Sequence, residues 1–237
     1  MRDLRADLGH VEQATRRLAS ANGSRAIMVL AADRGAGSTS VAVSLALRVE
    51  ALAARAVWLV DLNLDRSDAF DAFASPPFSA EGEMSRPYDA SLGRAPIYSL
   101  SPETQLEAQA RGSDKLLCVH QVSAKRLLVT RMRHERLSAN QRIQFRDSPS
   151  WWPAVRTAAD WTIVDAPALS ETGTGLTVAQ HTDGVVIVLR AGKTYADDAI
   201  ALRRDVEAAG GRVIGLVLNG MNPVIHRLTG SRLRRAN

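Results

Sequence analysis

The strongest constraint on the fold is a short glycine-rich loop, Gly35-Ala36-Gly37-Ser38-Thr39, which lies between an apolar run and a helical pattern. The apolar run covers residues 26–32 without interruption, as is typical of a strand buried on both faces of a parallel sheet. Apolar residues at helical spacing predict a helix over 38–54, and a second buried strand follows over 57–61. Strand, turn, helix and strand form a βαβ unit with a right-handed crossover. The loop therefore predicts an α/β fold.

The same alternation returns in the C-terminal third of the chain. Apolar runs predict strands over 161–165, 184–189 and 213–218. A helix predicted over 195–209 ends at Gly210-Gly211, which supplies a C-cap. Together with the first unit, these elements indicate a doubly wound, mostly parallel sheet of the P-loop NTPase type, with a deviant phosphate loop.

The sequence pattern divides the chain into three parts. An N-terminal segment, 1–23, carries an amphipathic helix predicted over 3–21. Residues 24–222 are predicted to form one P-loop NTPase-like domain, whose divergent middle segment, 66–124, contains loop-forming prolines and glycines. A basic tail, 223–237, closes the chain. Two further elements are predicted beyond the middle segment, a strand over 125–132 and a short helix over 149–159.

The glycine-rich loop carries most of the residues that a phosphate-binding loop needs. In such loops, backbone N–H groups at a helix N-terminus surround the phosphate, a lysine adds a positive charge, and the next Ser/Thr ligates Mg²⁺. Here Ser38 occupies the lysine position, and Ala32 occupies the position of the usual first glycine. The candidate phosphate-binding residues are Gly35, Ala36, Gly37, Ser38, Thr39 and Ser40.

Two aspartates end predicted parallel strands, Asp61 after the second strand and Asp165 after a later one. The carboxyl ends of such strands share one edge of the sheet, so we expect both carboxylates to converge there with the Thr39 hydroxyl. Asp61 and Asp165 are the candidate catalytic residues, vestigial or on the Mg²⁺ side. Thr39, Asp61 and Asp165 are the candidate ligands of any Mg²⁺. Each aspartate taken alone is equally explained as a helix N-cap or a loop residue.

A second segment, Gly192-Lys193-Thr194, spells the end of a phosphate loop but lacks its glycine-rich turn. The residue five positions before Gly192 is Ile187, which lies inside a predicted strand. We therefore interpret this segment as the loop that follows the strand.

Composition excludes several other kinds of chemistry. The net charge of +5 comes almost wholly from arginine, because Lys115, Lys125 and Lys193 are the only lysines. Cys118 is the single cysteine and is expected to be a small buried residue. The five histidines show no metal-ligand spacing, and none looks like half of a Ser-His or Cys-His pair. No apolar run approaches the roughly 20 residues of a membrane helix, and no signal peptide is expected.

These motifs together resemble the bacterial tyrosine kinases of capsule and exopolysaccharide synthesis, within the wider group of partitioning and septum-site ATPases. The family's phosphate loop usually reads Ser/Thr-x-x-Pro-Gly-Glu-Gly-Lys-Ser/Thr, and residues 31–39 keep both glycines and the last hydroxyl. The family's second motif, apolar residues then Asp-x-Asp-Leu-Arg, is similar to 57–65, with Asn63 in the place of the second acid. Its third motif, Asp-x-Val-Ile-Ile-Asp-Thr-Pro-Pro, is similar to 160–168. The resemblance covers about 24–66 and 155–222.

The departures from the family concern catalysis and assembly. Family kinases end in a cluster of autophosphorylated tyrosines, whereas the last tyrosine here is Tyr195. Glu12 and Arg16 are a fragment of the family's oligomerisation motif, and a solvated helix face explains them equally well. Partitioning ATPases carry an extra lysine at the loop start, where this chain has Asp33 followed by Arg34.

The resemblance implies a kinase-inactive accessory or regulatory protein of exopolysaccharide synthesis or export. It implies weak binding of Mg·ATP or ADP, or none. The expected partner is a membrane-bound chain-length, co-polymerase or polymerisation protein, and a homo-oligomer is a further expectation. The protein would then be cytoplasmic and peripheral at the inner membrane. Two alternatives stay open: an ATPase switch that positions cargo, and a P-loop protein that binds DNA. For the second, no recognition motif is visible, so nucleic acid is not an expected partner.

Overall fold

The computed structural model describes residues 1–18, 23–102 and 115–221. Its centre is an eight-stranded sheet in the order β10-β9-β1-β8-β2-β6-β5-β3. The first six strands of this order are parallel to one another, and β5 and β3 extend the sheet in antiparallel fashion. The parallel strands are β1 (Arg25–Ala31), β2 (Ala56–Asp61), β6 (Leu127–Met132), β8 (Ala159–Asp165), β9 (Gly184–Arg190) and β10 (Val213–Asn219). The predicted doubly wound, mostly parallel α/β fold is confirmed.

Helices cover both faces of the sheet, which explains why the central strands are continuously apolar. In β1, Ile27 and Val29 face one apolar core and Met28 and Leu30 face the other, all of them buried. The first core is closed by α1 (Gly9–Arg16), α2 (Ser38–Glu50) and α3 (Asp68–Asp71). The second is closed by α5 (Trp151–Ala158), α6 (Thr174–Ala179) and α7 (Ala196–Ala208).

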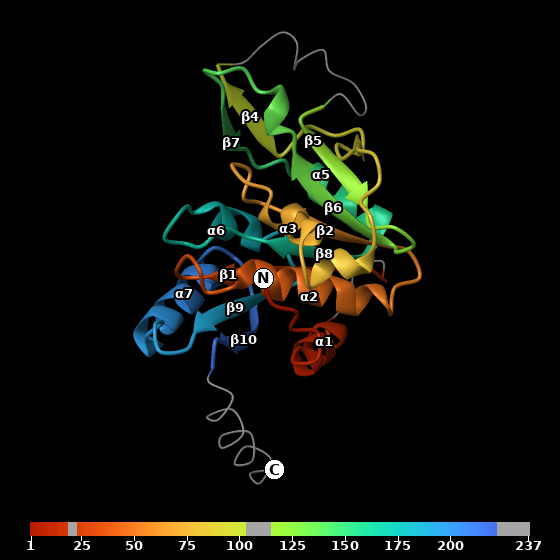
Figure 1. Cartoon of the computed structure of the whole chain (residues 1–237). Helices are drawn as coiled ribbons and strands as arrows, with labels where there is room; N and C mark the ends of the chain where they lie inside the picture. Colours follow the sequence, from red (N-terminus) through yellow and green to blue (C-terminus); the bar gives the residue numbers. More distant parts are fainter. Residues whose placement is uncertain (19–22, 103–114, 222–237) are drawn as a thin grey trace.

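The middle segment contains more structure than the sequence predicted. It supplies α3, the 3-10 turns η2 (Ala72–Ala74) and η3 (Phe78–Glu81), and the strands β3 (Tyr88–Asp89), β4 (Tyr98–Ser101) and β5 (Leu117–Gln121). After η5 (His134–Arg136), strand β7 (Arg142–Phe145) pairs with β4 in a separate antiparallel sheet, at the end of the molecule opposite β10 (Figure 1). The strand and the short helix that were predicted beyond this segment are confirmed as β6 and α5.

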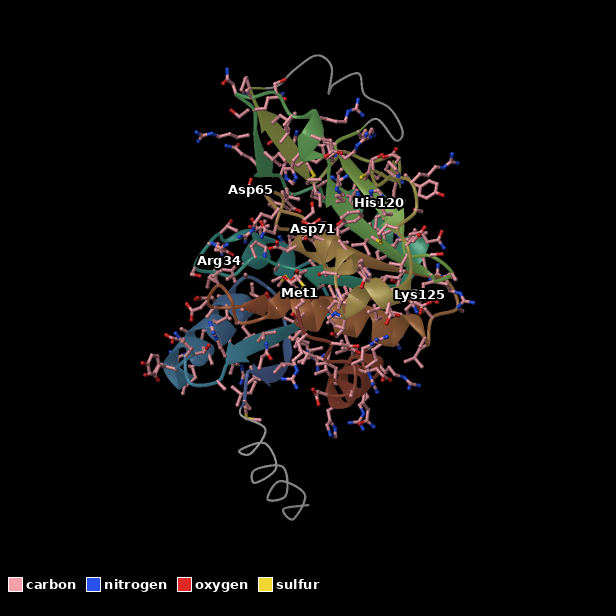
Figure 2. The ribbon with its side chains drawn as sticks, in the orientation of Figure 1. Met1, Arg34, Asp65, Asp71, His120 and Lys125 are labelled. Carbon is pink, nitrogen blue, oxygen red and sulfur yellow. The ribbon has the colours of Figure 1, made fainter. Side chains whose placement is uncertain are left out.

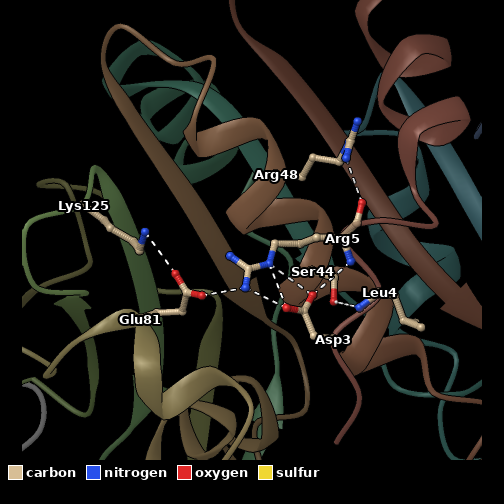
Figure 3. Close-up of polar contacts among 7 residues, drawn as sticks. All are labelled: Asp3, Leu4, Arg5, Ser44, Arg48, Glu81 and Lys125. Atoms are coloured by element: carbon tan, nitrogen blue, oxygen red, sulfur yellow. Dashed lines mark hydrogen bonds and ion pairs between the residues drawn. The ribbon is translucent and has the colours of Figure 1, made fainter.

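The N-terminal helix is shorter than predicted, because other contacts hold the chain that precedes it. The amide of Leu4 donates to Ser44 Oγ on α2 at 3.0 Å, and Arg48 Nη1 donates to the carbonyl of Arg5 at 2.8 Å. The Arg5 side chain reaches Glu81 at 2.7 Å (Figure 3). These contacts fix residues 3–5 across α2 in a non-helical path. The last part of the predicted helix, 19–21, and the whole of the predicted basic tail, 223–237, lie outside the described residues.

Glu12 contacts an arginine of another helix and does not lie on a solvated helix face. Its carboxylate accepts from Arg48 Nε at 2.7 Å and lies 3.5 Å from Arg16. The Glu12 side chain therefore joins α1 to α2 within the chain. Over the described ranges, no helix is both long and apolar enough to cross a membrane.

Candidate functional site

The phosphate loop joins the end of β1 to the first turn of α2, as its position in the sequence predicted. Gly35 and Gly37 adopt positive φ angles of 78° and 91°, a backbone region that side chains make costly. A Cβ atom at Gly37 would collide with Nδ2 of Asn219, at the end of β10. That same Nδ2 donates to the carbonyl of Ala36 at 2.8 Å. Glycine is thus required at position 37 because Asn219 connects the loop to the end of β10.

A cavity of about 330 Å³ opens at this loop, at the carboxyl edge of the sheet. Of the predicted phosphate-binding residues, Gly35, Gly37, Ser38, Thr39 and Ser40 line the cavity. Ala36 is not among the lining residues and is buried. The structure therefore gathers most of the predicted loop around one space, with the Ser38 hydroxyl where an ammonium group is expected.

Asp61 and Asp165 converge as the sequence predicted, because β2 and β8 are neighbours and pair these two residues directly. Asp61 is buried, and both of its carboxylate oxygens are used by its own loop. Oδ1 accepts from the amide of Asn63 and Oδ2 from the amide of Ala69, each at 2.9 Å. Burial, followed by the nearby charge of Asp165, raises the pKa of Asp61 well above its usual value. Asp61 thus shapes the loop that follows β2 and does not itself line the cavity.

Asp165 lines the cavity, and its polar atoms are only partly used. Burial raises the pKa of this carboxyl to about 7, although a hydrogen bond with the Thr39 side chain acts in the opposite direction. Its Oδ1 atom is buried without a hydrogen-bond partner. An orphaned buried oxygen of this kind is costly and calls for a proton, a cation or a ligand donor.

Three charged residues that sequence reasoning did not assign to the site also line this cavity: Arg66, Asp68 and Glu171. Arg34, considered there only as a substitute for the partitioning lysine, lines it as well and is exposed at the surface (Figure 2). Arg66 follows β2 and Glu171 follows β8, and loops at these strand ends form the ligand crevice in open α/β sheets. That rule was a signal that could have found them.

The carboxylate of Glu171 lies between the two arginines of the cavity. Its Oε1 atom is 3.5 Å from Arg34 Nε and 3.3 Å from Arg66 Nη2. Arg66 Nε is also 3.4 Å from Asp68. With the amide of Asn63 turned so that its oxygen faces Arg66, that oxygen accepts from Nη2 at 2.8 Å and from Nε at 3.1 Å. A neutral amide therefore makes the shortest contacts to the Arg66 guanidinium.

The cavity contains oxygen groups that could contact a Mg²⁺ ion bound to a phosphate. Two arginines and four carboxyl groups, Asp33, Asp68, Asp165 and Glu171, line the cavity. Within the described part of the chain, no group of three His, Cys, Asp or Glu side chains could hold a metal ion by itself. Thr39 and the unpartnered oxygen of Asp165 fit Mg²⁺ that is held mainly by phosphate oxygens and water.

A second cavity of about 480 Å³ adjoins the first, and the two share Asn63 and Pro167 as lining residues. It extends toward β7, whose Ile143, Gln144 and Phe145 line it. The predicted loop at Gly192-Lys193-Thr194 lies after β9, as expected, and it lines neither cavity.

Cys118 and His120 lie in contact, although no histidine looks like half of a Cys-His pair in the sequence. Cys118 Sγ lies 3.5 Å from Nε2 of His120, because residues two apart on β5 point to the same face. Burial raises the pKa of the Cys118 thiol to about 11 and lowers the pKa of His120. His120 Nδ1 is 2.6 Å from the carbonyl of Ser85. At neutral pH the pair is a neutral thiol beside a neutral imidazole, so it is no activated nucleophile.

The chain has an α/β fold of the P-loop NTPase-like class, and solved structures with this fold resemble it. No protein-family model matches the sequence, and no curated protein matches it either. The VpsO kinase domain aligns with a TM-score of 0.60 and 16% identity over 92% of this chain and 94% of that one. The kinase domain of Escherichia coli tyrosine kinase ETK aligns with a TM-score of 0.55 and 17% identity, over 92% of this chain and 73% of that one.

A cell-division protein is similar to the same degree. The MinC:MinD complex of Aquifex aeolicus gives a TM-score of 0.55 at 16% identity, over 86% of this chain and 72% of that one. The chain thus shares its fold with these kinase domains and with the aligned chain of the MinC:MinD complex.

Proposed function

We propose that this chain is a kinase-inactive relative of the bacterial tyrosine kinases and serves as an accessory or regulatory protein in exopolysaccharide synthesis or export. The observation that carries the proposal is the cavity at the phosphate loop. Its loop backbone is retained, but the lysine position holds Ser38, and both cavity arginines face carboxylates. The chain keeps the shape of a nucleotide site while lacking its usual source of positive charge.

The energetic effect of Ser38 falls mainly on catalysis. A hydrogen bond to a charged group contributes about 1.5–3 kcal/mol, so loss of the lysine weakens ATP binding by about one to two orders of magnitude. Phosphoryl transfer loses more, because charge stabilisation matters most in the transition state. The protein would hold Mg·ATP or ADP weakly, if at all, and Asp165 would not support turnover.

The tyrosine content supports the same proposal. Tyr195 is the last tyrosine of the chain and stands at the N-terminus of α7, where its amide donates to Asp198 at 3.2 Å. Tyr195 is exposed and begins a helix, and residues 196–237 contain no tyrosine. This stretch therefore holds no tyrosine cluster comparable to that of the family kinases.

The proposed partner is a membrane-bound chain-length, co-polymerase or polymerisation protein, which would hold this chain at the inner membrane from the cytoplasmic side. The likeness to tyrosine kinase domains, together with the motif resemblance to the exopolysaccharide family, supports this assignment. A homo-oligomer is proposed on the same ground.

Genetic complementation tests the function directly. In a strain without this chain, we expect polymer yield or chain length to change and to be restored by both the wild type and Asp165→Asn. Ser38→Lys should tighten Mg·ATP binding and leave complementation unchanged. A requirement for the Asp165 carboxylate, together with ATP turnover by the purified protein, would contradict the proposal.

A second candidate is an ATP-dependent switch that positions cargo. The retained Thr39 and Asp165 at the cavity favour it, since both belong to the nucleotide machinery of such ATPases. Light scattering with and without Mg·ATP distinguishes the two: the switch requires nucleotide-dependent dimers, and the accessory protein does not.

A further inference from the structure

The contact between Glu171 and the two arginines has the character of an exchangeable ion pair. Its distances, 3.3 Å to Arg66 and 3.5 Å to Arg34, exceed the 2.7–2.9 Å range of strong charge-assisted hydrogen bonds. The side chains remain partly exposed, by 29% for Glu171, 36% for Arg66 and 69% for Arg34. Exposed pairs of this kind contribute little to stability, so a competing anion could replace the carboxylate at small cost.

The two arginines approach Glu171 from different walls of the cavity. Arg34 belongs to the phosphate loop, and Arg66 belongs to the loop after β2 that the buried Asp61 holds in shape. Asn63 fixes the Arg66 guanidinium through a neutral oxygen, so this contact orients the group without cancelling its charge. Arg66 is thus a positioned cation, and both of its partnering carboxylates, Glu171 at 3.3 Å and Asp68 at 3.4 Å, are loosely held.

A separate observation shows that the cavity is built for a ligand. Asp165 lines it, is almost fully buried, and has one oxygen without any hydrogen-bond partner. A metal-bound or protonated phosphate supplies the cation or donor that this oxygen lacks. The positive charge lacking at Ser38 must then come from another wall of the cavity.

We propose that a phosphate group enters this cavity by displacing the Glu171 carboxylate from Arg66, and that Arg66 supplies the positive charge that Ser38 lacks. Glu171 is an internal competitor that lowers the affinity of the site. The inference rests on the proposed function in that it concerns the same cavity, and it assigns its ligand class: a phosphate ester or diphosphate, accompanied by Mg²⁺ or a proton.

Calorimetric titration of the full chain tests the exchange, with pyrophosphate and with ADP as separate ligands, each with and without Mg²⁺. Glu171→Gln keeps the shape of the side chain and removes its charge, and it should tighten binding about tenfold. Arg66→Gln should weaken binding about tenfold for the same reason. The matched controls are Glu207→Gln and Arg203→Gln, which break an exposed ion pair on α7 and should leave affinity unchanged.

The double variant separates exchange from simple repulsion. If Glu171 competes for Arg66, adding Glu171→Gln to Arg66→Gln should recover only a small part of the lost affinity. An equal tenfold gain in both backgrounds overturns the exchange, because Glu171 would then act only as a repelling charge. Absence of binding to Glu171→Gln, or an unchanged affinity in Arg66→Gln, also overturns it. Circular dichroism checks that each variant is folded.

The ligands and readout keep this test separate from the proposed function. If pyrophosphate binds as well as ADP, the site recognises the phosphate alone; if only ADP binds, the nucleoside contributes. Neither titration measures phosphate transfer. Turnover of ATP would therefore overturn the kinase-inactive assignment while leaving the Glu171 exchange standing. Unchanged affinities in the Glu171→Gln and Arg66→Gln variants would overturn the exchange while leaving the kinase-inactive assignment standing.

Discussion

The arginines that hold the helices in place differ from those at the phosphate cavity. Arg48 contacts Glu12 at 2.7 Å and the carbonyl of Arg5 at 2.8 Å, and Arg156 contacts Asp183 at 2.8 Å. At the cavity, the Glu171 contacts to Arg34 and Arg66 measure 3.3–3.5 Å, and an oxygen of Asp165 has no partner. Arg48 and Arg156 are committed to the fold, whereas the polar groups at the cavity remain available to a ligand.

The largest expected effect comes from Asp165, whose pKa of about 7 lies above the usual 3.8. The folded state then binds more protons than the unfolded state between these values. The contribution of Asp165 to the free energy of unfolding is therefore fully present at low pH and falls as pH rises from about 4 to 7. Asp165→Asn should remove this loss and gain roughly 4 kcal/mol at pH 8. Urea unfolding across pH measures this gain. A pH profile of stability that the substitution leaves unchanged would show that the pKa of this carboxyl is not raised.

The next effect concerns a carboxylate that is committed to the fold. Asp183 accepts from Arg156 and from the amide of Ala26, each at 2.8 Å, so Asp183→Ala leaves two donors without their partner. We expect a loss of about 2–3 kcal/mol, measured by urea unfolding. The matched control is Glu207→Gln on α7, which should change stability by less than about 0.5 kcal/mol. Equal effects would remove the distinction between the two kinds of pair.

The phosphate loop is a third point of comparison. Gly37→Ala should cost about 2 kcal/mol, because it adds a collision with Asn219 to the strain of a positive φ angle. Gly93→Ala is the matched control: Gly93 also has a positive φ, but its Cβ would meet open space. Its cost should be about 1 kcal/mol. If the two substitutions cost the same, the Asn219 contact does not constrain the loop.

The smallest effect is the sharpest test of the contrast itself. Arg48→Gln should destabilise the protein by about 1–1.5 kcal/mol, because it loses short contacts to Glu12 and Arg5. Arg66→Gln should cost only about 0.5 kcal/mol, although it weakens ligand binding. Thermal unfolding of both variants without ligand measures the difference. A larger loss for Arg66→Gln would make that residue a structural one.

The sequence predicted the fold well because its parallel strands are continuous apolar runs that end in recognisable residues. It also predicted that Asp61, Asp165 and Thr39 would meet, since strand ends share an edge. It did not predict β3, β4 and β7, because short exposed strands carry little hydrophobic pattern. Arg66 and Glu171 were missed because their contact joins loops 105 positions apart. The Cys118–His120 contact was missed although residues two apart on a strand share a face.

We propose that the cavity receives a phosphate group but does not transfer it. A single-turnover experiment tests this most directly, with the protein in excess over ATP labelled at its γ-phosphate, in the presence of Mg²⁺. We expect the label to be recovered as intact ATP, with none released as phosphate and none attached to the protein. Release or transfer of the label by the wild type, abolished in Asp165→Asn, would contradict it.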